Sequence, residues 1–90
     1  MKIYLVAIVD YDEYDLRHTC LSYEAALKRF HELRQEIISQ NNEKIEFDKS
    51  EGIDPSGWVE QNKVLETWTP GSVSSRSGEV PQIREIEVEV

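Results

Sequence analysis

Apolar residues in this chain follow two different spacings, one typical of strands and one typical of a helix. Residues 3–9 are apolar at both odd and even positions, and most of them are β-branched or aromatic. This pattern predicts a strand that is apolar on both faces, and such a strand is usually central in its sheet. Charged and apolar residues alternate from residue 85 to the end of the chain. This alternation predicts a last strand with Ile86, Val88 and Val90 facing the core and the glutamates facing water. The first strand is therefore expected between the second strand and the last.

A helix is predicted from Ser22, a good N-cap that is followed by Glu24 in the first turn. Apolar side chains then recur at helical spacing on one face. These residues are Tyr23, Ala26, Leu27, Phe30, Leu33, Ile37 and Ile38. The helix is expected to stop near residues 40–42.

The remaining segments are interpreted as strands separated by turns. The expected strands are residues 16–21, 44–48, 58–59 and 64–68, with a type I turn at residues 54–57. The pattern predicts an α+β domain over residues 1–90: a mostly antiparallel sheet of four to five strands with one amphipathic helix packed on one face. Residues 71–79 are rich in Ser and Gly and are expected to form a mobile loop.

Three short stretches resemble small, mostly uncharacterised phage and bacterial domains of β-β-α-β order. They are residues 2–6 at the start of the chain, residues 22–26 at the start of the helix and residues 83–88 near the end. The resemblance implies the fold and a phage or bacterial origin, and it transfers no functional residue.

The charge narrows the choice of partners. The chain has 18 acidic and 10 basic residues and a formal net charge of −8. Such a chain repels nucleic acid and anionic membranes, because phosphate binding needs clustered Lys and Arg. Basic protein surfaces become possible partners, and the competing and commoner interpretation is that the negative charge simply keeps a small protein soluble. The single cysteine excludes an internal disulfide, and the apolar run at the N-terminus is too short to cross a membrane, so a cytoplasmic protein is expected. With the origin that the resemblance implies, the cell would be a bacterium or a phage-infected host.

The sequence offers no catalytic or cofactor motif, and a non-enzymatic protein is predicted. The acidic segment 10–15 lacks the Gly and the bidentate Glu of an EF-hand loop, which leaves a looser divalent-metal site at a hairpin tip as a weaker alternative. His18, Cys20 and His31 lack the spacing of zinc ligands.

The carboxylates of Glu85, Glu87 and Glu89 are predicted to lie along one face of the last strand, with Glu60 and Glu66 on a neighbouring strand. Such a face could imitate nucleic-acid phosphates and occupy a basic groove of another protein. The competing interpretation is a solvated face whose charges protect an edge strand.

Two tryptophans and the hairpin tip complete the predicted partner-binding set. Trp58 and Trp68 are expected in the core, and either would become an interface anchor if exposed. Asp12 and Glu13 extend the acidic surface at the hairpin. The leading prediction is a small acidic inhibitor or adaptor that binds another protein, and the alternative is a structural domain that dimerises by strand pairing.

Overall fold

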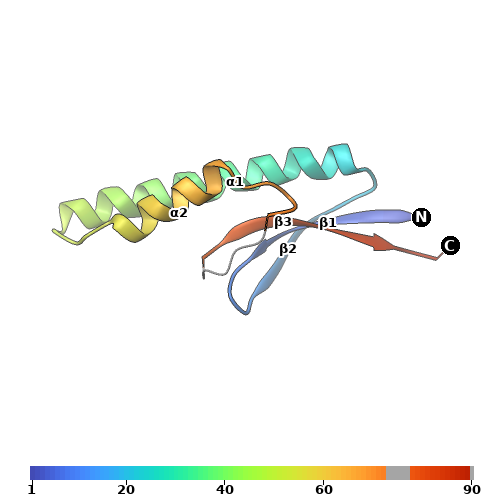
Figure 1. Cartoon of the computed structure of the whole chain (residues 1–90), viewed down its shortest axis with the longest axis horizontal. Helices are drawn as coiled ribbons and strands as arrows, with labels where there is room; N and C mark the ends of the chain where they lie inside the picture. The colour runs from blue at the N-terminus through green and yellow to red at the C-terminus, as the bar shows by residue number, and fades with distance from the viewer. Residues whose placement is uncertain (73–77, 90) are drawn as a thin grey trace.

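The computed structural model describes residues 1–72 and 78–89, which form three strands and two helices (Figure 1). In chain order these are β1 (Lys2–Val9), β2 (Tyr14–Cys20), α1 (Tyr23–Ser50), α2 (Ser56–Glu66) and β3 (Val80–Glu87). The strands form one antiparallel sheet in the order β2-β1-β3. The prediction of a central first strand is confirmed. Residues 73–77, the middle of the predicted mobile loop, lie outside the described residues.

The fold prediction was wrong in its details. An α+β arrangement agrees with the structure, but the described residues contain a sheet of three strands rather than four or five, and two helices rather than one. Residues 44–48, 58–59 and 64–66, which were predicted to lie in strands, are helical, so α2 also interrupts the expected β-β-α-β order.

The first helix passes straight through its predicted end at residues 40–42. Ile37, Asn41 and Ile45 are all buried and follow one another at steps of four residues. Asn41 is 2% exposed, and its side-chain amide donates to Gln61 Oε1 at 3.2 Å and to Asn62 Oδ1 at 3.0 Å. The buried stripe therefore continues through a polar residue, whose hydrogen bonds join α1 to α2.

The second helix begins at the predicted turn of residues 54–57. The carboxylate of Asp54 accepts the Ser56 amide at 3.0 Å, and the Trp58 amide donates to the Pro55 carbonyl at 3.0 Å. A type I turn has nearly helical backbone angles, so the same residues can start a helix. Leu65, seven positions after Trp58, is fully buried and anchors the helix in the core.

The ends of α1 follow standard capping chemistry. The Ser22 hydroxyl accepts the Ala25 amide at 3.1 Å, which confirms the predicted N-cap. At the other end Gly52 has φ of 71°, and the Ile53 amide donates to the Asp48 carbonyl at 2.8 Å. This is a Schellman motif, in which a glycine adopts the left-handed conformation that ends the helix.

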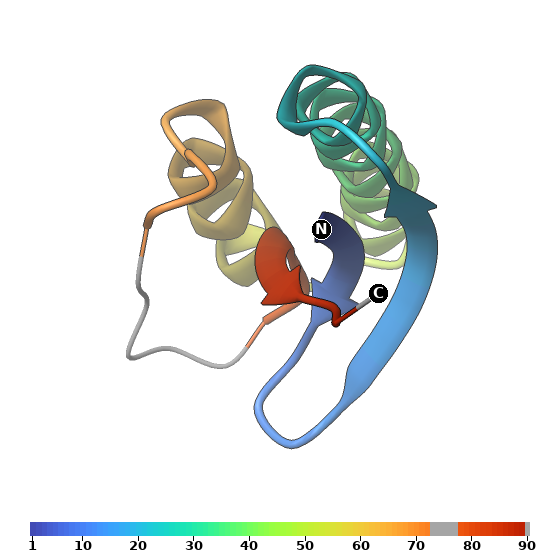
Figure 2. The ribbon, with the colours of Figure 1, turned by 90° about the vertical axis from the view of Figure 1, so that its right-hand side faces the viewer.

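Both helices lie on the same face of the sheet (Figure 2). Side chains of α1 pack on Val6 and Ile8 of β1, and the core is completed from the segment that follows α2 and from β3. The core residues are Val6, Ile8, Ala26, Phe30, Leu33, Ile37, Leu65, Trp68 and Val80. The 28 residues of α1 span about 42 Å, whereas β1 spans about 26 Å, so the helical layer extends well beyond the sheet in Figure 1. The molecule measures 56 × 22 × 20 Å.

Candidate interaction surface

The second face of the sheet, here called the open face, is not covered by any helix or strand of the described chain (Figure 2). Val6 and Ile8 point into the core, and successive side chains of a strand point to opposite faces, so their odd-numbered neighbours in β1 point the other way. Residues directly opposite one another in an antiparallel pair share a face. The register therefore defines the open face as Ile3, Leu5, Ala7, Val9, Tyr14, Leu16, Thr19, Gln82, Arg84 and Ile86. Val80 lies opposite Val9 at the start of β3 but packs in the core, so it is not part of this face.

This face is mostly apolar, although the chain as a whole is strongly acidic. Tyr14 and Leu16 are 46% and 48% exposed, and Ile3, Leu5 and Ile86 are half-buried. The ten residues that define the face include no Asp or Glu, although the chain has 18 acidic residues. Apolar surface that is continuous and rimmed by polar groups marks interaction sites in soluble proteins.

The one charged residue of the open face lies over an aromatic ring. The guanidinium carbon of Arg84 is 5.8 Å from the centre of the Tyr14 ring. Both side chains therefore lie against the sheet surface. The positive guanidinium is attracted by the quadrupole of the ring, and Arg84 is the one formal charge among the ten residues of the open face.

The two edges of the sheet are less suited to pairing with another strand. The register of β2 shifts between Val6 and Ala7, which leaves Arg17 without an opposite residue, as in a β-bulge. In β3, Pro81 has no amide hydrogen, and its carbonyl accepts the Trp68 indole at 2.8 Å. Bulges and prolines discourage strand addition at sheet edges, so these features count against a dimer formed by strand pairing.

Only part of the predicted row of carboxylates is free to bind a partner. Glu85 and Glu87 lie opposite Tyr4 and Lys2 of β1, on the same face as the helices, whereas Glu89 follows the end of β3. The alternation was predicted correctly, but Ile86 lies on the open face instead of in the core. Val90 lies outside the described residues.

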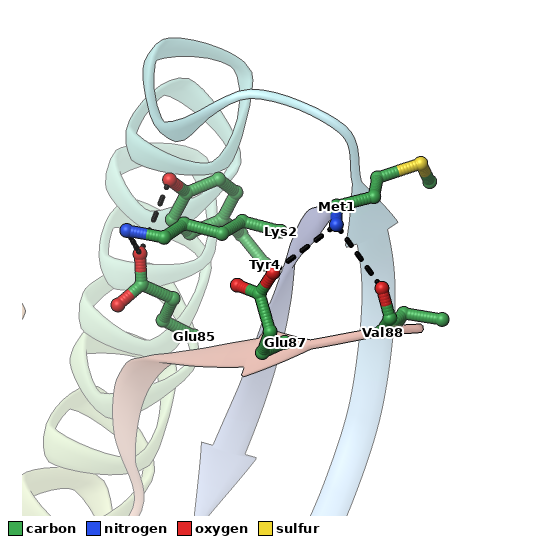
Figure 3. Close-up of polar contacts among 6 residues, drawn as sticks. All are labelled: Met1, Lys2, Tyr4, Glu85, Glu87 and Val88. Atoms are coloured by element: carbon green, nitrogen blue, oxygen red, sulfur yellow. Dashed lines mark hydrogen bonds and ion pairs between the residues drawn. The ribbon is translucent and has the colours of Figure 1, made fainter. Parts of the chain in front are cut away.

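Basic groups already pair with both strand glutamates (Figure 3). The ammonium of Lys2 is 3.3 Å from Glu85 Oε1, and the Tyr4 hydroxyl donates to the same oxygen at 3.4 Å. The amino terminus of Met1 is 3.1 Å from Glu87 Oε1. The hydrogen bond with Glu85, together with the negative charge of its carboxylate, raises the pKa of Lys2. The two carboxylates thus hold the start of β1 against the end of β3.

Beside Glu85 lies a hollow of about 450 Å³, here called the tyrosine hollow. It is lined by Tyr4, Tyr23, Pro70, Gly71, Ile83 and Glu85. The rings of Tyr4 and Tyr23 meet edge to face, with centroids 5.8 Å apart and planes at 68°. Sequence reasoning identified Glu85 as a binding residue but missed both tyrosines, because nothing in the spacing connects residues 4, 23 and 85.

The other predicted partner-binding residues are dispersed. Trp68 is 4% exposed and belongs to the core, as expected. Trp58 is half-buried, with the Lys44 ammonium 4.3 Å from its ring centre, and it lines a hollow of about 420 Å³ together with Asp10 and Gln61. Glu60 and Glu66 lie on α2, so the predicted neighbouring strand of carboxylates is wrong.

The acidic hairpin tip lies at the opposite end of β1 from Glu87. Asp12 and Glu13 are exposed there, whereas Asp10 Oδ1 accepts the amides of Tyr11 at 2.7 Å and Gly78 at 3.0 Å. Over residues 1–72 and 78–89, no three His, Cys, Asp or Glu residues are placed to hold a metal ion. The tip therefore gives the metal-binding alternative no support.

The open face had a signal in the sequence. Residues 3–9 are apolar at both parities, and this pattern was interpreted as a strand with both faces buried. The helices cover one face of this strand. The other face is the open face, on which Leu5 and its odd-numbered neighbours lie.

Comparisons with protein-family models, with curated proteins and with solved structures give no match to this chain. Neither helix in the described part of the chain is both long and apolar enough to cross a membrane.

Proposed function

We propose that the protein is a non-enzymatic protein–protein interaction module that binds through its open face, and that a second copy of the chain occupies this face. In this arrangement two sheets pack face to face about 10 Å apart, as in a β-sandwich. The observation that carries the proposal is the mostly apolar face around Leu5, Leu16 and Ile86, which no described helix or strand covers.

Among the surfaces of the chain, the open face is the one where charge opposes contact between two copies least. Two chains of net charge −8 repel each other, and most other contacts would bring carboxylates together. The open face lacks carboxylates, and its one cation, Arg84, lies against Tyr14. It is therefore the surface on which two copies approach with the least repulsion. Arg and Tyr are also enriched in protein interfaces.

The size of the open face sets the expected affinity between the two copies. Three strands of about eight residues cover about 26 Å by about 14 Å. Such a footprint is small compared with the roughly 800 Å² that each partner buries in a standard interface. The dimer is therefore expected to dissociate in the micromolar range, and salt is expected to strengthen it by screening the repulsion between the two chains.

Sedimentation velocity from low to high micromolar protein concentration tests the proposal. The wild-type chain should shift from monomer to dimer, and Leu16→Glu should abolish the shift, because it places a carboxylate in each copy of the interface. Leu21→Glu is the matched control: Leu21 is exposed outside the strands, so this variant should dimerise only slightly more weakly than the wild type.

Two results would reject the proposal. One is a wild-type chain that stays monomeric over the whole concentration range. The other is a dimer that Leu16→Glu leaves intact while circular dichroism shows a native fold. Leu5→Lys repeats the test at the centre of the face, in case Leu16→Glu fails to fold.

A further inference from the structure

The tyrosine hollow lies on the opposite side of the sheet from the open face and has a distinct chemistry. Two tyrosine rings, a proline, a glycine and an isoleucine form its walls, and Glu85 is the one charged residue among the described residues that line it. The carboxylate is about half exposed. An apolar, aromatic wall beside a single carboxylate suits a side chain with a long apolar stem and a cationic end.

A cation is already present at the rim of this hollow. Lys2 is not among the lining residues, yet its ammonium reaches Glu85 Oε1. Between described residues, the contacts of this carboxylate all involve Oε1. A donor that enters the hollow therefore meets a carboxylate of which one oxygen, Oε2, forms no hydrogen bond or ion pair with a described residue. Lys2 is itself mostly exposed and can move aside at little cost.

We propose that the tyrosine hollow binds an arginine side chain of a partner protein. A planar guanidinium can stack on the Tyr23 ring while it donates to the Glu85 carboxylate, and Ile83 and Pro70 contact its methylene groups. The net charge of −8 attracts basic segments over a distance and speeds their encounter. The site is independent of the proposed dimer, because it lies on the helix-bearing face.

An NMR titration of the ¹⁵N-labelled chain tests the site with a blocked Gly-Arg-Gly peptide. The matched probe is the same peptide with citrulline, which keeps the shape of arginine but has no charge. The arginine peptide should shift the amides of Tyr4, Tyr23 and Ile83 with an affinity of roughly 1 mM or weaker, and the citrulline peptide should not. The Leu16→Glu background keeps the protein monomeric, so failure of the dimer does not affect this experiment.

Three variants test whether the arginine peptide binds at Glu85 in the tyrosine hollow. Glu85→Gln should weaken binding about fivefold or more, because it removes the charge that pairs with the guanidinium. Glu87→Gln removes the same charge from the same strand and face, outside the hollow, and should weaken binding less than about twofold. Lys2→Gln should strengthen binding about twofold, because it removes the internal competitor.

Several outcomes would overturn the proposal. Equal weakening by Glu85→Gln and Glu87→Gln would indicate diffuse attraction to an acidic protein. Shifts centred on the hairpin residues Asp12 and Glu13 would place the peptide elsewhere. Equal shifts with the citrulline peptide, or no shifts with the arginine peptide, would show that the hollow does not recognise a cationic side chain.

Discussion

The guanidinium carbon of Arg84 in β3 lies 5.8 Å from the ring centre of Tyr14 in β2, although β1 lies between the two strands. Adjacent strands are about 4.8 Å apart, so these side chains must reach toward each other across the central strand. Arg84 is opposite Leu5 and Tyr14 is opposite Val9, so they meet above Ala7. Ala7 is 0% exposed, although it lies on the open face. A small residue here lets the two edges of the sheet contact one another.

A double-mutant cycle measures the contact between Arg84 and Tyr14. Arg84→Gln, Tyr14→Leu and the double variant should give a coupling of about 0.5–1 kcal/mol in the free energy of unfolding, because a cation–π contact at an exposed site has about this strength. Urea denaturation at low micromolar concentration, where the chain is monomeric, provides the values. Strictly additive single effects would show that the side chains do not interact in solution.

The buried amide between the two helices leads to a second prediction. Asn41→Ala should lower the free energy of unfolding by about 1–2 kcal/mol, because half-buried Gln61 and Asn62 each lose a donor. Asn42→Ala is the control at the adjacent position. It carries the same gain in helix propensity and removes only the exposed hydrogen bond that Asn42 Oδ1 accepts from the Asn62 amide at 3.0 Å. The difference between the two variants in urea denaturation therefore measures how much more the buried hydrogen bonds contribute than the exposed one, and equal stabilities would contradict their importance.

Asn41 also explains where sequence reasoning failed. Ser22 predicted the start of α1, and the apolar stripe predicted most of its buried face, because capping and periodicity are local properties. Tyr23, the first residue of the predicted stripe, is 47% exposed. The end of the helix was misplaced because a polar residue interrupts the stripe. Only the partners on α2, about twenty residues away, satisfy the Asn41 side chain. A single sequence does not reveal such partners.

The candidate sites depended on long-range geometry to different degrees. Glu85 was found from its alternation with Ile86, but its pairing with Lys2 joins opposite ends of the chain. Residues 3–9 are apolar at odd and even positions, and this pattern alone does not show whether one face of the strand or both are covered. Which faces are covered depends on how the helices pack, which is a property of the tertiary structure. The two tyrosines of the hollow meet only because the start of α1 packs over β1.

The indole of Trp68 leads to a third prediction. Its Nε1 donates to the Pro81 carbonyl at 2.8 Å inside the core. Trp68→Phe should lower the free energy of unfolding by about 2–4 kcal/mol, because it leaves a buried carbonyl unpaired and removes ring volume. Trp58→Phe, at a half-buried ring, should cost about 1 kcal/mol or less. Thermal or urea unfolding compares them, and the reverse order would place Trp58 rather than Trp68 at the centre of stability.

The ion pair between Lys2 and Glu85 leads to a fourth prediction. The hydrogen bond and the charge of Glu85 are the largest causes that raise the pKa of Lys2 above its ordinary value of 10.5, and Glu87 contributes less. Both Glu85→Gln and Glu87→Gln should therefore lower the pKa of Lys2, and Glu85→Gln should lower it more. NMR titration of the lysine side chains at alkaline pH measures both shifts. Equal responses to the two substitutions would show that Lys2 senses only the general charge of β3.

The same ion pair gives stability a pH dependence of defined sign. The pKa of Lys2 is higher in the folded chain than in the unfolded chain, so folding is favoured while the lysine is protonated. This contribution is complete below the unfolded pKa near 10.5 and is lost as the pH rises through the higher folded value. The wild-type chain should lose more stability than Lys2→Gln over that alkaline window in urea denaturation. Because Lys2 is exposed, the difference should be small and should shrink in high salt, and a salt-independent difference would contradict an ion pair as its cause.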